Sequence, residues 1–334
     1  LLLLFCGLLA FAAGYLAPEP LTAVRLATEL ALPFLLIAAL LSVVYGARTW
    51  ACVASAGGAT SGAFIAVAAL GLIHAAAASA RDPGFQVDVD ENAYLGTALS
   101  LYQEREMSQP FRGYWIDGEF VLFESLLDKR SMLWPTVIAG GHLAAGFHPD
   151  NAIRINRVLS FLALLLAFLL FRGIAGAIGG FTAALMLGLV PQFVFSARCS
   201  GVEILNLLLV TQTWIFARAF WKHPGPNTAL ALCASCVLLA YCRNESVLFV
   251  IPAGIVILAK HIRDPNLRQH PLLLLIPFLL VPYLWQFRIF QVEDQPFEYG
   301  NRFLDVSAPP FGLEYLWANL ADAARFLFAT DGGY

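Results

Sequence analysis

Charged residues are scarce in this 334-residue sequence, because Asp, Glu, Lys and Arg together make up only 13% of it. Soluble domains carry about 25% charged residues, so a chain this poor in charge is atypical of them. A basic excess is also absent, since 20 Lys and Arg stand against 23 Asp and Glu, for a net charge of −3. This balance argues against a nucleic-acid-binding protein, whose affinity depends on neutralising phosphates.

Cysteine is present but does not indicate a disulfide framework. The six cysteines lie mostly within apolar segments, where disulfide bonds are not expected. Cys233 and Cys236 form a Cys-x-x-Cys pair, but a metal ion needs more ligands than the neighbouring sequence offers. We therefore interpret the pair as small packing residues in an apolar helix.

Hydrophobic residues are abundant instead, at 59% of the chain, and the mean hydropathy is +0.72. This excess is too large for one buried core and predicts an integral membrane protein. A spanning helix needs roughly 17–25 mainly apolar residues. About nine segments meet that criterion, at residues 1–17, 30–46, 60–80, 153–171, 173–196, 203–220, 228–242, 246–261 and 271–290.

Two regions are too polar to span throughout, and they divide the chain. We expect N-terminal transmembrane helices over 1–80, a large loop with short interfacial helices over 81–152, a transmembrane bundle over 153–290 and a second loop over 291–334. The predicted fold class is an all-α polytopic membrane protein. Because the first residues lie inside an apolar run and the last loop stops abruptly, we interpret the chain as a piece of a longer protein.

Basic residues in the short connections predict the orientation of the spans. If the N-terminus is cytoplasmic, the short opposite connections carry only Arg25, Arg198 and Arg243. The cytoplasmic connections then carry Arg48, Arg172, Arg218, Lys222, Lys260, Arg263 and Arg268. Under the same topology Asp264 alone among the 23 acidic residues faces the cytoplasm, and both large loops lie on the other side. We therefore expect the chemistry on the non-cytoplasmic side.

The densest acidic motif follows the third predicted span, where Asp88, Asp90 and Glu91 stand within four residues and Tyr94 follows. Carboxylates this close can act as a general base, or Asp88 and Asp90 can hold a divalent cation. The same residues also fit the start of a helix, with Asp90 as the N-cap, Glu91 in the first turn and Tyr94 in a buried stripe. The two interpretations are compatible, since a cap fixes the direction of the acids.

Two basic motifs follow on the same predicted face. Lys129 and Arg130 precede an apolar stretch and could hold a phosphate, although interfacial anchoring is an equally simple interpretation. Arg154 and Arg157 stand three residues apart at the start of the fourth predicted span, so they share one helix face. They could meet a lipid phosphate or the acids of the first loop, or only snorkel to the interface.

Further charges lie at later helix ends on this face. Glu203 begins the sixth predicted span, and Arg243 and Glu245 join the seventh to the eighth. Charges next to the hydrocarbon are costly and usually face a cavity or one another. Ion pairs such as Arg243–Glu245 or Arg198–Glu203 therefore compete with a catalytic role as the explanation.

Taken in order, these motifs resemble bacterial glycosyltransferase family 39, which belongs to the GT-C superfamily together with protein O-mannosyltransferases and lipid A and core sugar transferases. The matching motifs are Asp-Glu-x-x-Tyr, Lys-Arg-x-x-Leu-x-Pro, an Arg/Asn-rich helix start, Ser-x-x-x-x-Gly-x-Glu-x-Leu-Asn-Leu and Arg-x-Glu-Ser, over roughly residues 85 to 290. Two departures are Ser131, where the family commonly has proline, and the additional acid Asp88.

The resemblance implies a GT-C helix bundle in the bacterial inner membrane with its active site on the extracytoplasmic side. It implies transfer of a sugar, with inversion, from a polyprenyl-phosphate donor to a lipid, glycan or protein acceptor. Asp90 matches the catalytic acid and Glu91 its neighbour, while Lys129, Arg130 and Arg243 would bind the donor phosphate. Supporting positions are Asp88, Tyr94, Arg154, Arg157, Glu203 and Glu245.

Two other functions fit a polytopic membrane protein. A transporter or flippase would place ionisable residues in the middle of its spans and break helices at mid-membrane. A non-catalytic assembly subunit would use the acidic motif only as a helix cap. Neither requires a cofactor, and a divalent cation at Asp88 and Asp90 stays open under the enzyme hypothesis.

Overall fold

The computed structural model describes residues 35–49, 61–80, 82–84, 88–116, 119–127 and 130–263, together with residues 317, 320 and 321. The predicted spans at 1–17 and 271–290, nearly all of the predicted loop at 291–334 and the position of Lys129 lie outside these residues. The described fold is therefore that of the central part of the chain.

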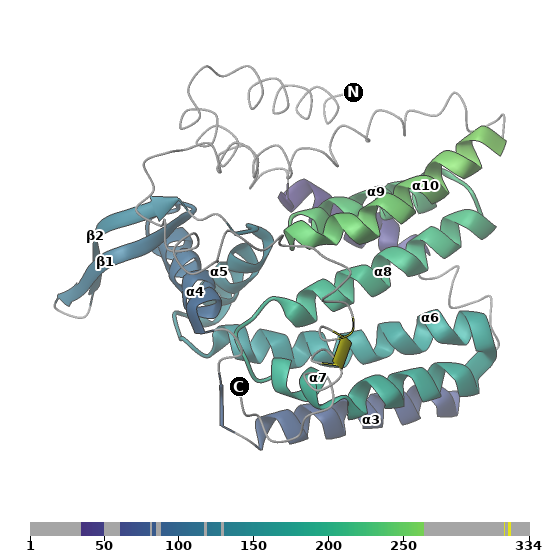
Figure 1. Ribbon diagram of the computed structural model, residues 1–334, viewed down its shortest axis with the longest axis horizontal. Helices are drawn as coiled ribbons and strands as arrows, with labels where there is room; N and C mark the ends of the chain where they lie inside the picture. The colour runs from purple at the N-terminus through teal and green to yellow at the C-terminus, as the bar shows by residue number, and fades with distance from the viewer. Residues whose placement is uncertain are drawn as a thin grey trace.

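Long helices running side by side form the body of the described structure (Figure 1). They are α3 (Ser61–Ser79), α6 (Asn151–Leu189), α8 (Glu203–Lys222), α9 (Pro226–Ala240) and α10 (Val247–Arg263). A further apolar helix spans Leu35–Thr49. Three helices, α3, α6 and α8, are long and apolar enough to cross a membrane. The expected bundle of apolar helices is confirmed to this extent.

Helix α6 reverses direction within its 39 residues, at Ala175 and Gly176, whose backbone angles are not helical. Gly176 has φ 74° and ψ −174°, a conformation that is essentially restricted to glycine. The two predicted spans at 153–171 and 173–196 therefore exist as two antiparallel halves of one element, visible as the reversal in Figure 1. The second half ends at Leu189, earlier than predicted, because Val190 is extended and Pro191 starts the short helix α7 (Pro191–Ser196).

The first polar loop folds at one end of the bundle as α4 (Asp88–Gln103), β1 (Ser108–Ile116), β2 (Glu119–Leu127) and α5 (Leu133–Ala145) (Figure 1). The strands pair antiparallel, with Ile116 opposite Glu119. The prediction of helices alone was wrong here. Aromatic-rich runs flank an Asp-Gly dipeptide at 117–118 in the sequence, which is the pattern of a two-residue hairpin connection.

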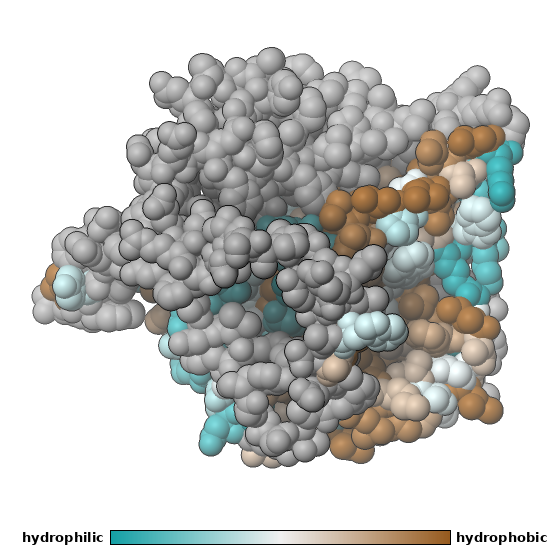
Figure 2. Space-filling model, in the orientation of Figure 1, coloured by the Kyte–Doolittle hydropathy of each residue, from teal (hydrophilic) through white to brown (hydrophobic). Residues whose placement is uncertain are grey.

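The core lies between α8 and α9 and continues under α5. Its largest fully buried side chains include Trp134, Phe216, Phe220, Leu232 and Leu239. Figure 2 shows hydrophobic surface on the part of the bundle away from the hairpin. Exposed large apolar side chains in the described helices include Ile65 of α3, Ile178 of α6 and Ile255 of α10. An exposed apolar surface of this kind suits contact with lipid.

Candidate functional site

The connection between α7 and α8, residues 197–202, is held by side chains from three other elements. The Trp134 indole of α5 donates to the Ser200 carbonyl over 2.7 Å. The Asn156 amide of α6 donates to the carbonyls of Cys199 and Gly201 over 2.9 and 2.8 Å. Because Trp134 and Asn156 are fully buried, these bonds form without competition from water and fix the connection.

Glu91 of α4 is the third tether of this connection. Its Oε2 accepts hydrogen bonds from the Ser200 backbone N–H over 2.6 Å and from the Ser200 hydroxyl over 2.7 Å. The residue is only 1% exposed. A carboxylate so enclosed is placed to anchor the connection and has almost no surface for a substrate. Its predicted role as a catalytic neighbour of Asp90 stays a prediction, and its position favours a structural contribution.

Asp90 lies in the first turn of α4 and points outward, with 51% of its side chain exposed. The helix begins at Asp88, so the predicted N-cap role of Asp90 was wrong: two further residues join the helix before it. Arg130 donates from Nε and Nη2 to the same Asp90 oxygen, Oδ1, over 3.1 and 2.7 Å. The Arg130 guanidinium also lies 6.0 Å from the centre of the Tyr94 ring.

Glu203, Arg243 and Glu245 form a second ion-paired group. Arg243 Nη1 lies 3.3 Å from Glu203 Oε1, and its Nε lies 3.2 Å from Glu245 Oε2. Glycine at 201 leaves room for the Glu203 carboxylate, since a side chain there would collide with it. The predicted pair of Arg243 and Glu245 is therefore present and extended by Glu203, whereas Arg198 instead packs over the Phe195 ring.

Electrostatics favour the charged forms of Glu245 and Arg243. Partial burial opposes ionisation of Glu245, but hydrogen bonds from its own backbone and from Arg243 outweigh it and lower the pKa of Glu245. Burial likewise opposes the charge on Arg243, yet the hydrogen bond to Glu245 and the charges of Glu245 and Glu203 raise the pKa of the guanidinium. The charge of Asp90 also acts on Glu245, so the two ion-paired groups are electrostatic neighbours.

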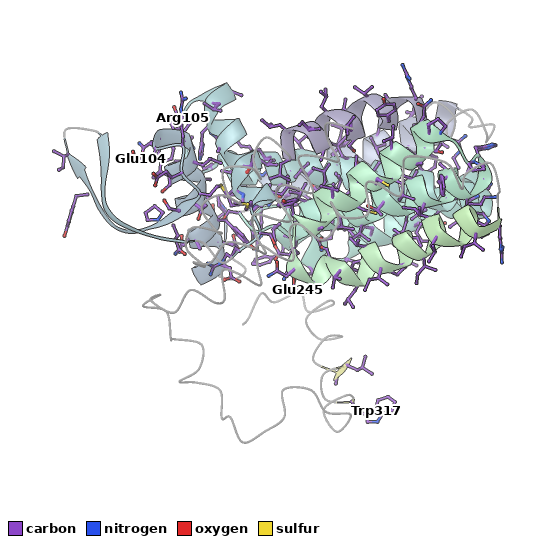
Figure 3. All side chains as sticks on the ribbon, turned by 90° about the horizontal axis from the view of Figure 1, so that it is seen from above. Glu104, Arg105, Glu245 and Trp317 are labelled. Carbon is purple, nitrogen blue, oxygen red and sulfur yellow. The ribbon has the colours of Figure 1, made fainter. Side chains whose placement is uncertain are left out.

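The start of α5 ties the two groups together. The Ser131 hydroxyl, next to Arg130, donates to the Asn244 amide oxygen over 2.9 Å. The Leu133 backbone N–H donates to the Tyr241 carbonyl over 3.1 Å. The predicted residues Asp90, Arg130, Glu203, Arg243 and Glu245 thus meet at one end of the bundle. Figure 3 shows Glu245 there, at the end nearest the hairpin, with Glu104 and Arg105 beyond it on the side of α4.

Other predicted site residues do not join these groups. Arg154 is exposed and reaches Asn151 Oδ1 over 3.4 Å, and Arg157 is partly buried on α6. Neither forms an ion pair with a carboxylate in the described part of the chain, and their predicted contact with a lipid phosphate or with the acids of the first loop stays a prediction. Asn156, between them, faces the 197–202 connection.

Sequence reasoning missed the residues that hold the site, namely Trp134, Asn156 and Ser200. Asn156 carried a signal, because it recurs with Ala152, Ser160 and Ala163 at helical spacing and all four are buried. A polar residue in such a stripe must have buried partners. Ser200 and Trp134 carried no comparable signal, since their partners come from distant segments.

The predicted cation site at Asp88 and Asp90 stays a prediction. Within the described ranges no three His, Cys, Asp or Glu side chains are grouped so that they could hold a metal ion. Asp90 is engaged by Arg130, and the Asp88 side chain is not among the described ones. Burial, with a contribution from the charge of Glu91, raises the pKa of the Cys199 thiol to about 12, so this thiol stays protonated and does not supply a thiolate ligand.

The resemblance to glycosyltransferase family 39 is an interpretation of motifs, and comparison with known proteins does not extend it. No protein-family model, no curated protein and no solved structure matches this chain.

Proposed function

We propose that the protein is a membrane glycosyltransferase, which transfers a sugar with inversion from a polyprenyl-phosphate carrier to a hydroxyl group of an extracytoplasmic lipid, glycan or protein. One observation carries this proposal: Asp90 with Arg130, and Glu203 with Arg243 and Glu245, meet at one end of an apolar helical bundle. An exposed carboxylate beside one guanidinium, with a second guanidinium in the neighbouring group, provides a base and phosphate-binding groups together.

Asp90 is the proposed base. Arg130 occupies only Oδ1, so Oδ2 stays outside that interaction. In the proposed reaction Oδ2 takes the proton of the acceptor hydroxyl while the hydroxyl oxygen bonds to the sugar C1. The bond from C1 to the phosphate oxygen breaks on the opposite face, and the lipid phosphate leaves with the electron pair. The positive charge that develops at C1 resembles that of other glycosyl transfers.

Arg130 and Arg243 are the proposed phosphate ligands, with Lys129 as a further candidate. Negative charge grows on the leaving phosphate, and guanidiniums placed beside it stabilise that charge in the transition state. In the structure Arg130 binds Asp90, so a bound phosphate competes with Asp90 for the same guanidinium. Donor binding would thereby release the base for the acceptor.

The distribution of charge favours this proposal over a transporter. In the described apolar helices, Asp, Glu, Lys and Arg lie near helix ends or beside the break in α6. His74 of α3 is the exception among these ionisable residues, because it lies nearer the middle of its helix than the end. Transport of a polar substrate would instead require ionisable groups at mid-membrane depth.

Substitution of Asp90 by asparagine tests the proposal. Asp90→Asn keeps the size of the side chain and a hydrogen-bond acceptor for Arg130 but removes the base. We expect transfer from a polyprenyl-phosphate sugar to fall by roughly 10²–10⁴-fold, the range of general-base contributions. The measurement is product formation by the purified full chain in nanodiscs, with folding checked by circular dichroism.

Glu104→Gln is the matched control, since Glu104 is an exposed carboxylate at the other end of α4. It should keep full activity. Full activity of Asp90→Asn would remove Asp90 from the mechanism. Absence of transfer by the folded wild-type chain across a panel of polyprenyl-phosphate sugars would contradict the glycosyltransferase proposal and favour an assembly subunit.

A further inference from the structure

The end of the bundle opposite the candidate site carries cations and no carboxylate among the described residues. The two ends of the bundle thus differ in charge, because all described acidic residues lie toward the hairpin end. The basic side chains of this far end are Arg172, Arg218, Lys222, Lys260 and Arg263.

Two of these cations serve the fold itself. Arg218 donates to the Gly173 carbonyl beside the reversal of α6. Arg172 is 8% exposed and packs over the Phe64 ring. Both guanidiniums are therefore engaged by the bundle itself, which leaves Lys222, Lys260 and Arg263 as the cations available to an external ligand.

These remaining cations gather around one tryptophan. Lys260 Nζ lies 5.3 Å, and Arg263 Cζ 5.6 Å, from the centre of the Trp221 ring, so two cations from α10 meet an indole from α8. Trp221 is 41% exposed, and Lys222 beside it is also exposed. In the described part of the chain none of the three cations forms an ion pair. We call Trp221, Lys222, Lys260 and Arg263 the Trp221 cluster.

The Trp221 cluster borders the exposed apolar side of α10. Ile255, Leu258 and Ile262, all more than half exposed, lead along this helix to the cluster. Figure 2 shows the hydrophobic surface of this region next to hydrophilic residues at the far edge of the molecule. Lysine and arginine that extend from an apolar surface, with tryptophan at the same level, match the depth of phospholipid headgroups.

We propose that the Trp221 cluster binds the phosphate of an anionic phospholipid, with the acyl chains against α10. The three cations attract the headgroup, and the indole keeps two of them at the level of the apolar boundary by cation–π contact. The inference rests on placement of the bundle in a membrane and is independent of the candidate site at the other end.

Lipid retention tests this proposal. The full chain is placed in nanodiscs of phosphatidylcholine with increasing phosphatidylglycerol, released into detergent, and its bound phosphatidylglycerol is counted by native mass spectrometry. Lys260→Gln combined with Arg263→Gln should lower retention by roughly 20- to 30-fold, since each cation near a lipid surface contributes about a fivefold factor. Arg263→Gln alone should lower it by about fivefold.

Arg105→Gln removes the same charge from an exposed position at the opposite end and should leave retention unchanged. Equal retention by the wild type and the double variant would overturn the proposal, and so would an equal loss in Arg105→Gln. Trp221→Phe supports the proposal if retention falls with the cations intact and contradicts the indole contribution if it does not. Transfer activity is not part of this readout, so failure here leaves the proposed enzyme function standing.

Discussion

His142 joins α5 to α6 through a buried hydrogen bond. Its Nδ1 accepts from the Asn151 amide over 3.0 Å, and the same amide donates to the Gly146 carbonyl over 2.8 Å. The ring is 1% exposed and packs against Tyr102 and Phe147. Burial, helped by the neighbouring charge of His148, lowers the pKa of His142. The junction therefore depends on a neutral imidazole.

Stability should consequently fall as the pH is lowered through the histidine range. The folded-state pKa lies below the unfolded value of 6.5, so the stability that His142 contributes is present above 6.5 and is lost as the pH falls through the folded value. His142→Gln has no titrating group and should flatten the change in unfolding midpoint between pH 7 and pH 5. Thermal unfolding in detergent at several pH values measures this.

His223→Gln is the matched control, because it removes an exposed imidazole from another part of the chain. It should keep the pH dependence of the wild type. Equal pH slopes for His142→Gln and the wild type would show that the buried imidazole does not control the acid sensitivity.

The adjacent acids Asp90 and Glu91 show what sequence could and could not predict at this scale. The motif located both residues at the site, but successive positions on a helix point about 100° apart. The side chain of Asp90 is therefore 51% exposed, whereas Glu91 is only 1% exposed. Which of the two would be buried depends on Ser200, which is 109 residues away from Glu91 and carries no local signal.

At the scale of elements, the reversal of α6 depends on one backbone conformation. Gly176 has a positive φ of 74° combined with an extended ψ, and a side chain there is strained whatever the space around it. After the reversal the two halves of α6 pack closely against each other. A side chain at Gly180 in the second half would collide with the Phe168 backbone in the first half. The two halves of α6 can lie together only with glycine at these positions.

Gly176→Ala should therefore destabilise the protein by about 1–3 kcal/mol, the usual cost of a residue held in a disfavoured backbone region. The free energy of unfolding in mixed micelles gives the comparison. Gly140→Ala is the control, since Gly140 is exposed within α5 and nothing lies near its added methyl group. It should be neutral or slightly stabilising. A similar stability of both variants would contradict the strain argument.

Apolar length located the elements of the bundle well, because a helix that contacts lipid must be a long apolar run. Predicted segments at 60–80, 203–220, 228–242 and 246–261 match α3, α8, α9 and α10 to within a few residues. The hairpin was missed because the region was judged by hydropathy, which does not separate a strand from a surface helix. Its aromatic-rich runs and Asp-Gly dipeptide were the stronger local signal.

At the scale of the whole molecule, charge is distributed unevenly along the bundle. The described carboxylates lie toward the hairpin end, and the far end carries the Trp221 cluster and its basic neighbours. Basic residues favour the cytoplasmic side of a membrane. The proposed orientation therefore places α4, the hairpin and the candidate site on the other side.

Accessibility of single cysteines checks this orientation. Arg105→Cys and His223→Cys place thiols at exposed positions on opposite ends. In cells, a membrane-impermeant maleimide should label the first nearly completely and the second only after permeabilisation. The four described cysteines are buried, and Cys6 and Cys52 are replaced by alanine. Labelling of both positions from the same side would contradict a membrane-spanning bundle, and the reverse pattern would invert its orientation.

The tethered connection at 197–202 has a consequence for the order of folding. Its bonds to Glu91, Trp134 and Asn156 join residues 109, 66 and 43 positions apart. Contacts between residues so far apart in sequence form only after the intervening helices have come together, because each contact closes a long loop of chain. The candidate site therefore assembles late, and a chain that completes it has already brought α4, α5 and α6 to their final places.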